Sequence, residues 1–207
     1  MDTQTKLDKI ETYVKQKFYN DPTGHDYNHM KRVAKMAKKI ALKEQANPFV
    51  AEVSGWLHDI GDKKLFSNPA IAIEEMNEFL SCIDLSPKQV TIINEIISNV
   101  SFRKGKTPHS IEGKIVQDSD RLDAMGAIGI ARAFAFGGAH DRLIHAEDKE
   151  FKDTATIQHF YDKLLQLKDL MNTKTAQEIA NDRHEMMVVF LKQFYYEWNI
   201  NEKKSDL

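Results

Sequence analysis

The chain has 207 residues, 42 % of them hydrophobic, and a formal net charge of −2 at pH 7. This length predicts one domain, or one domain with an extension, that can bury a sizeable core. A slightly acidic chain has no general attraction to nucleic acid or to an anionic membrane, so the expected partner is a small molecule. Cys82 is the only cysteine, which excludes an internal disulfide and a zinc site built from several thiolates.

The sequence also carries an expectation about location. No apolar run is long enough to span a bilayer. Residues 1–6 lack the apolar core of a signal peptide, so we expect a cytoplasmic protein. A monomer and a homodimer are equally compatible with these patterns.

Helices are predicted nearly everywhere, and no segment alternates like a strand. Three dipeptides place a capping side chain before a proline, which suits the first helical position. They are Asn47-Pro48, Asn68-Pro69 and Ser86-Pro87. The spacings from Ser86 to Gln89 and from Thr175 to Glu178 are those of capping boxes. We expect an all-α fold, a single compact bundle of roughly eight to ten helices, given the usual length of a helix.

Two histidines occupy informative positions in these helices. His29 shares an apolar stripe with three residues and should therefore face the interior. These residues are Val33, Met36 and Ile40. His58 follows Ala51 and Gly55 on a face of small residues, where two helices can approach closely. Gly61 can end that helix just after the pair His58-Asp59.

A third segment carries three aspartates. Asp118 lies within its apolar stripe, whereas Asp120 and Asp123 lie together on another side of the helix. The stripe consists of Ile111, Ile115 and Leu122. Periodicity alone favours Asp118 as the residue that faces the interior. A helix buried on both sides would be compatible with either choice.

Two later segments have open interpretations. Residues 137–150 are polar and contain glycine, so they form either a lid over a substrate or a mobile surface loop. His140-Asp141 repeats the earlier His-Asp pair there, but without a helical setting. Arg183 lies inside the apolar stripe of the last predicted helix, where a guanidinium needs a carboxylate or a phosphate partner. A structural ion pair and a substrate contact both satisfy that need.

His29, His58, Asp59 and Asp120 together have the composition of an open metal site. Imidazole nitrogen suits Mn, Fe, Co, Ni and Zn, whereas carboxylate oxygen suits harder ions such as Mg and Mn. Four protein ligands leave positions of an octahedral ion open for water and for a phosphoryl oxygen, which the ion activates. We therefore predict a hydrolase with one divalent metal ion. Manganese is the first choice, and magnesium, iron, cobalt, nickel or zinc are compatible.

Three segments resemble the signatures of the HD superfamily of metal-dependent phosphohydrolases. They are GHDYNHMKRV at 24–33, GWLHDIGDK at 55–63 and VQDSDRLDAMGA at 116–127. The resemblance implies that His29, His58, Asp59 and Asp120 bind the metal. It favours Asp120 because the ligating aspartate of the family likewise precedes a basic and an apolar residue. Asp118 and Asp123 remain alternates, or neighbours of the ligands.

The resemblance extends over nearly the whole chain. It implies one HD-type domain over residues 1–207, with a metal-binding core at about 20–130 and C-terminal helices at about 152–200 that complete the bundle. Residues 126–134, 159–165 and 194–198 look like a bacterial subgroup, some of whose members resemble nucleotide pyrophosphohydrolases. These enzymes split a nucleoside triphosphate, or its deoxy form, into monophosphate and pyrophosphate. Substrate identity rests on this resemblance alone.

Other functions stay open. Within enzymes, the alternative is a nucleotide phosphomonoesterase or a phosphodiesterase of a signalling nucleotide. From another class, the chain could be a regulatory module that binds a metal or a nucleotide without turnover. Nucleic-acid binding ranks lower, because the chain lacks a basic stripe.

Further residues are candidates for proton transfer and phosphate binding. Asp62 lies one turn beyond His58; relatives often have a catalytic acid there, and a solvated turn carboxylate is the alternative. Lys63 is positioned to bind a polyphosphate tail. Asn99 stands where relatives often carry histidine, which argues against a second metal and favours a hydrogen bond to a ligand. Arg103 binds phosphate or is a plain loop charge. The remaining candidates for substrate binding are Arg121, Asp123 and Arg183.

Overall fold

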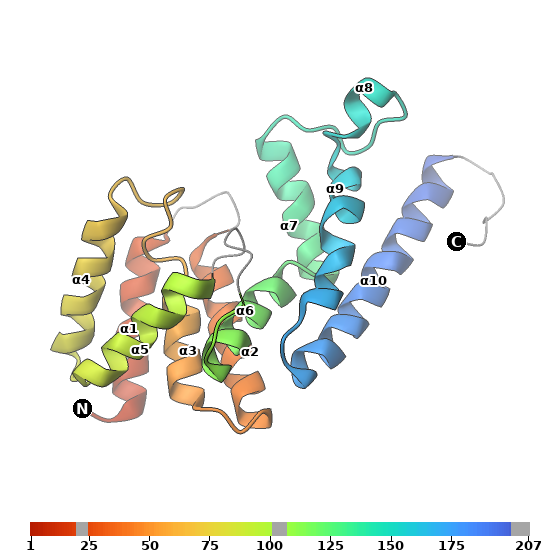
Figure 1. Ribbon diagram of the computed structural model, residues 1–207. Helices are drawn as coiled ribbons and strands as arrows, with labels where there is room; N and C mark the ends of the chain where they lie inside the picture. Colours follow the sequence, from red (N-terminus) through yellow and green to blue (C-terminus); the bar gives the residue numbers. More distant parts are fainter. Residues whose placement is uncertain (20–24, 101–106, 200–207) are drawn as a thin grey trace. The chain divides into compact units, whose positions relative to one another are not determined.

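The chain is helical in the part that the computed structural model describes, which comprises residues 1–19, 25–100 and 107–199 (Figure 1). The first helices are α1 (Thr3–Lys17), α2 (Tyr27–Lys43), α3 (Pro48–Leu57), α4 (Pro69–Cys82), α5 (Pro87–Val100) and α6 (Ile111–Asp123). They are followed by α7 (Gly126–Ala139), α8 (Lys149–Lys152), α9 (Thr156–Asp162), the 3-10 helix η2 (Leu164–Leu170) and α10 (Lys174–Trp198). The all-α prediction is confirmed.

Three helix starts lie where the Asx-Pro and Ser-Pro dipeptides predict them. The side chain of Asn47 accepts hydrogen bonds from the first amides of α3, and that of Asn68 accepts one from Ile71 N in α4. In α5 the capping box is complete, because Ser86 Oγ accepts from Gln89 N and Gln89 Oε1 accepts from Ser86 N. Each contact satisfies an amide that the helix itself leaves without a partner.

One predicted start is wrong. The capping box from Thr175 to Glu178 is not formed, because α10 begins at Lys174 and Thr173 is its cap. The hydroxyl of Thr173 accepts a hydrogen bond from Ala176 N, at 3.4 Å. Both threonines have a hydroxyl suited to capping, and the chain uses the earlier one.

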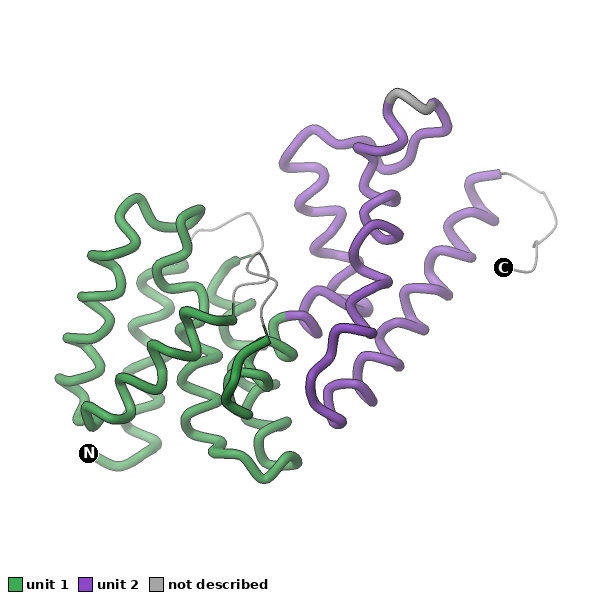
Figure 2. The backbone as a smooth tube through the Cα atoms, in the orientation of Figure 1, with its two compact units in different colours: residues 1–120 green, residues 121–207 purple. Residues whose placement is uncertain are grey.

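The backbone divides into two compact units, Met1–Asp120 and Arg121–Leu207 (Figure 2). Unit 1 holds α1 to α5 and most of α6, and unit 2 holds α7 to α10. The boundary falls inside α6, directly after Asp120. One domain over residues 1–207 stays a prediction.

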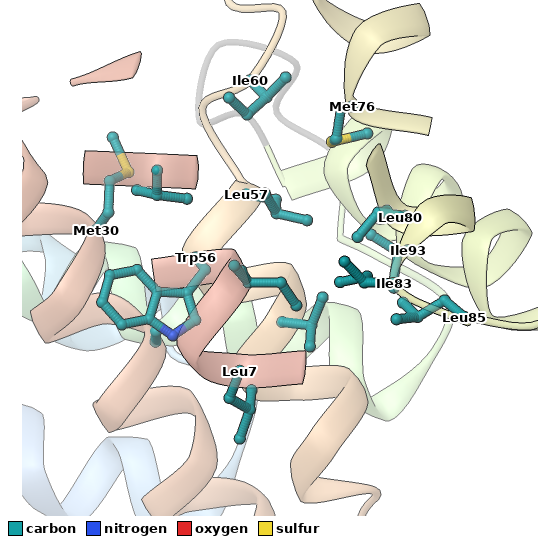
Figure 3. Packing of buried hydrophobic residues seen from close by; sticks show 14 of the residues in the cluster. Leu7, Met30, Trp56, Leu57, Ile60, Met76, Leu80, Ile83, Leu85 and Ile93 are labelled. Atoms are coloured by element: carbon teal, nitrogen blue, oxygen red, sulfur yellow. The ribbon is translucent and has the colours of Figure 1, made fainter. Parts of the chain in front are cut away.

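The hydrophobic core of unit 1 is built around α3, which contacts α1, α2 and α5. Figure 3 shows Trp56 and Leu57 of α3 among side chains from the neighbouring helices. Met30 of α2 and Ile93 of α5 are fully buried in the same cluster. Each large apolar side chain removed from water contributes about 1.5–3 kcal/mol, so this packing fixes α2 and α3 as a rigid pair. Both helices lead into the residues of the predicted metal site.

Unit 2 has its own packing, in which α10 lies against α7 and η2, and α9 lies against η2 and α7. Met187 and Leu191 of α10 are buried in it, whereas Trp198 at the end of that helix is 41 % exposed. Among the described residues, no helix combines the length and the apolar character needed to cross a bilayer.

Candidate metal centre

The start of α2 places the first histidine. Asp26 is the helix cap, and its Oδ1 accepts a hydrogen bond of 2.8 Å from the backbone N–H of His29. This contact fixes where the helix begins and therefore the direction in which His29 projects. The His29 side chain is fully buried, as its apolar stripe predicts.

The second histidine is brought close to the first by the approach of α3 to α2. A Cβ atom on Gly55 would lie only 2.8 Å from Cα of Ala34, so no larger residue fits there without moving a helix. The predicted close approach on the face of Ala51 and Gly55 is thereby confirmed. It brings the rings of His29 and His58 to a centroid distance of 5.2 Å.

His58 and Asp59 lie in a turn just beyond the last residue of α3. His58 is the C-cap of that helix, so the helix ends two residues earlier than one running through the pair would. Its Nδ1 lies 2.9 Å from the carbonyl oxygen of Gly55, to which Nδ1–H donates. Gly61 has φ +82°, a left-handed conformation that glycine adopts freely, and it turns the chain after the pair.

Asp120 comes from α6, which is buried around most of its circumference. Its consecutive residues Ile115, Val116, Gln117, Asp118 and Ser119 are all buried. Five consecutive residues point in all directions around a helix, so periodicity could not choose between Asp118 and Asp120. The structure brings Asp120 to the two histidines, and Asp118 belongs to no candidate metal cluster of the described residues.

The four side chains meet at one place within unit 1. Ligand atoms of His29, His58 and Asp120 all lie within 4.8 Å of one another. Asp120 Oδ1 is 3.5 Å from His29 Nε2 and 3.7 Å from His58 Nε2. Asp59 Oδ1 completes the group, 3.4 Å from His58 Nε2. We call these four residues the His-Asp cluster.

The carboxylates of the cluster shift its pKa values in a way that favours a bound cation. Burial by itself lowers the pKa of His58, but the carboxylates of Asp59 and Asp120 outweigh it and raise that pKa to about 9. For Asp120, burial acts to raise the pKa, and His58 then lowers it to about 2. The pKa of Asp59 is lowered below its usual range against the same effect of burial, first by His58 and then by His25. Two neighbouring carboxylates thus attract positive charge.

A divalent ion fits this arrangement. Because Nδ1 of His58 carries the proton that Gly55 O accepts, Nε2 has its lone pair directed into the cluster. That Nε2 atom is buried and makes no hydrogen bond within the described residues. Once both imidazoles are neutral, as ligation requires, they and the two carboxylates carry a charge of −2, which a divalent cation neutralises.

Comparison with known proteins agrees with this geometry. The model of the HD domain family matches residues 26–125 of the chain. The Bacillus subtilis protein YpgQ is 40 % identical over 192 residues, which are 91 % of each chain. The chain belongs to the HD superfamily. It is therefore a metal-dependent hydrolase, and the His-Asp cluster is a group of side chains that could hold the metal ion.

Solved structures resemble the chain over almost their whole length. The crystal structure of YpgQ in complex with ADP has a TM-score of 0.82 at 38 % identity, covering 95 % of this chain and 97 % of that one. An HD-superfamily hydrolase from Bacillus thuringiensis has a TM-score of 0.81 at 40 % identity, covering 97 % and 100 %. The likeness thus includes both units.

One residue beside the His-Asp cluster was not predicted from the sequence. His25 Nδ1 lies 2.8 Å from Asp59 Oδ2, and its ring packs edge-on against His29 with centroids 5.4 Å apart. His25 precedes the cap of α2 and belongs to no helix, so helical periodicity gave no signal for it. The spacing of four residues before His29 was the available clue.

Three further residues predicted for proton transfer or substrate binding have local contacts or lie exposed. Asp62 is half-buried, and its Oδ1 accepts a hydrogen bond of 2.8 Å from Lys64 N, which closes the turn. Lys63 is exposed in the same turn. The amide of Asn99 donates to Glu95 O in its own helix, at 2.7 Å. Arg103 lies outside the described residues.

The other substrate-binding candidates have partners within unit 2. Arg183 Nη1 donates to the carbonyl oxygen of Leu122 at the end of α6, and Arg121 Nη1 donates to Leu170 O. Asp123 is buried and pairs with Arg132 at 2.7 Å. These contacts favour a structural interpretation of all three residues.

The second His-Asp pair has a local role as well. His140 caps α7, stacks on Phe136 at a centroid distance of 3.9 Å, and its Nδ1 lies 2.9 Å from Phe136 O. It joins no candidate metal cluster of the described residues. Within the polar segment 137–150, helix α8 begins at Lys149.

Proposed function

We propose that this HD-superfamily chain is a nucleotide pyrophosphohydrolase that converts a nucleoside or deoxynucleoside triphosphate into the monophosphate and pyrophosphate. The observation that carries the proposal is the buried Nε2 of His58, directed at two carboxylates that need a cation. A cytoplasmic location, and a small-molecule partner rather than nucleic acid, belong to the same proposal.

The four residues of the His-Asp cluster would hold one divalent ion, for which we propose manganese because the donor set mixes nitrogen and oxygen. The ion supplies Lewis acidity, which lowers the pKa of a coordinated water and polarises a phosphoryl oxygen. The chain orients its ligands through the Gly55 carbonyl on His58 and the Asp26 cap before His29. These supports keep the ligand atoms in place before the ion arrives.

Side-chain exposure suggests the side from which substrate approaches. His29 and His58 are 0 % and 2 % exposed, Asp59 is 13 % exposed, and Asp120 is 29 % exposed. The histidines therefore close the inner side of the cluster and exclude water from it. A phosphate group would reach the ion past Asp120.

Two residues of the turn after Asp59 have proposed roles. Asp62 would accept a proton from the attacking water, since only its Oδ1 is engaged by the Lys64 amide among the described residues. Lys63 would contact a phosphate beyond the one that is attacked, because it is exposed on the same turn. Both side chains follow the ligand Asp59 within four residues.

The nucleotide part of the proposal is supported by a relative. YpgQ has been crystallised in complex with ADP, so a protein of this shape accepts a nucleotide with two phosphates. The same observation favours a second candidate, in which only the terminal phosphate of a triphosphate is removed and the diphosphate is released. The two candidates differ in the phosphorus atom that is attacked.

Product analysis separates them. Chelator-stripped protein reloaded with Mn²⁺ would be incubated with a panel of nucleoside and deoxynucleoside triphosphates, and all phosphorylated products resolved. We expect monophosphate and pyrophosphate in equal amounts. Diphosphate with free phosphate would favour the second candidate, and absence of metal-dependent turnover would reject both.

A further inference from the structure

His25 contacts Asp59 of the His-Asp cluster, and with His29 and Asp59 it also forms a second group of side chains that could hold a cation. Its Nδ1 lies 2.8 Å from Oδ2 of Asp59, a residue 34 positions later in the chain. The His25 side chain is 38 % exposed, in contrast to the nearly buried Asp59 that it contacts. The distance is that of a charge-assisted hydrogen bond.

The two oxygens of Asp59 therefore have different neighbours. Oδ2 accepts the hydrogen bond from His25 and lies 3.8 Å from His29 Nε2, whereas Oδ1 accepts no bond from His25 and lies 3.4 Å from His58 Nε2. A free carboxylate rotates about its last bond and can present either oxygen, or both, to an ion. A donor fixed on Oδ2 selects Oδ1 and sets the plane of the carboxylate.

The chain holds His25 in position by two means. Asp26 caps α2, which fixes the backbone directly after His25. The His25 ring also packs edge-on against the buried ring of His29, at an interplanar angle of 84°. A histidine held from two directions can impose a geometry on its partner, whereas a freely rotating one cannot.

We propose that His25 is a positioning residue, whose Nδ1–H fixes the Asp59 carboxylate so that it binds the metal ion through Oδ1. It would raise the affinity for the ion and define its ligand geometry without being a ligand itself. Metal binding can be measured without substrate, so a test of this role does not depend on which phosphate bond is cleaved.

The test compares three variants of the full chain. His25→Ala removes the donor, His25→Asn places an amide N–H near the position of Nδ1, and His25→Gln places it near that of Nε2. His140→Ala, which changes a histidine of the other unit, is the control. The readouts on chelator-stripped protein are Mn²⁺ affinity and stoichiometry by calorimetry, the visible absorption spectrum with Co²⁺, and thermal unfolding.

We expect one ion per chain and a loss of Mn²⁺ affinity of about 10- to 100-fold in His25→Ala, the usual effect of removing a group that orients a ligand. His25→Gln should resemble His25→Ala, and His25→Asn should recover most of the affinity and the wild-type Co²⁺ spectrum. Unfolding of the metal-free proteins should be unchanged, since His25 lies outside the helices.

Three results would overturn the proposal. Wild-type affinity and spectrum in His25→Ala would show that the contact has no effect on the ion. Two ions in the wild type, one of which is lost in His25→Ala, would make His25 a ligand. Equal loss in His25→Asn and His25→Ala, with both proteins folded, would show that the ring itself is required rather than its donor.

Discussion

The Cβ that Gly55 lacks would lie 2.8 Å from Cα of Ala34 in the neighbouring helix. That approach of α3 to α2 sets the distance between His29 and His58, which project from the two helices. The lack of a side chain at Gly55 thus sets the distance between the two histidines of the cluster.

Gly55→Ala should consequently disturb both stability and metal binding. The obstacle is backbone rather than a flexible side chain, so α2 and α3 must move apart, at a cost of about 1–3 kcal/mol. We expect a lower unfolding free energy in denaturant titrations and weaker Mn²⁺ binding by calorimetry. Gly138→Ala is the matched control, because a Cβ at Gly138 has nothing within 4 Å. Equal behaviour of the two variants would contradict the packing argument.

Asp59→Asn should abolish activity while the helical fold remains. The amide has nearly the same shape as the carboxylate but no charge, so only the affinity for the ion changes strongly. We expect Mn²⁺ affinity to fall by more than about 100-fold, beyond the usual effect of residues that merely support ligands. Far-ultraviolet circular dichroism should stay that of the wild type. A variant with full metal-dependent turnover would exclude Asp59 as a ligand.

Local rules predicted much of the fold and of the cluster. The starts of α3, α4 and α5 follow from a capping side chain and a proline, which act over three or four residues. The same rules failed at α10, where Thr173 and Thr175 both suit a cap and the structure uses Thr173. Periodicity placed His29 inside, and the small residue Gly55 indicated a close helix approach.

The features that the sequence could not predict depend on contacts between residues far apart in the chain. His25 belongs to no helix, and Asp59, the residue that it contacts, lies 34 residues later. Because α6 is buried on most sides, hydrophobic periodicity could not distinguish Asp118 from Asp120 as the ligand. Only the family resemblance favoured Asp120. The position of Arg183 predicts a carboxylate or phosphate partner, and the structure gives it a backbone carbonyl, Leu122 O, which no side-chain pattern reveals.

Metal affinity should rise steeply with pH. In the metal-free cluster the pKa of His58 is raised to about 9 by Asp59 and Asp120, so the imidazole is protonated at neutral pH. Binding of an ion must displace that proton, because only the neutral imidazole is a ligand. Below pH 9 the affinity should therefore increase about tenfold for each pH unit, in proportion to the proton released. Above pH 9 this contribution should vanish.

Calorimetry in buffers of different ionisation enthalpy measures the protons released per ion bound. Mn²⁺ and Zn²⁺ should give the same proton count, because the proton belongs to the protein rather than to the ion. A proton count of zero at pH 7 would contradict the raised pKa of His58. The experiment is best limited to pH values at which neither ion precipitates as hydroxide.

Removal of the positive charge of Lys63 should affect a triphosphate substrate more than a monophosphate ester. In Lys63→Ala the exposed ammonium beside Asp62 is lost, whereas the ligands and the fold stay intact. If Lys63 contacts a phosphate beyond the attacked one, KM for a triphosphate should rise several-fold, by about 1 kcal/mol or more for a charge-assisted contact. KM for a monophosphate ester should change little. Lys88→Ala, which removes an exposed lysine from the first turn of α5, is the control. Equal increases for both substrates would favour the phosphomonoesterase, because the lysine would then act on the one phosphate that both share.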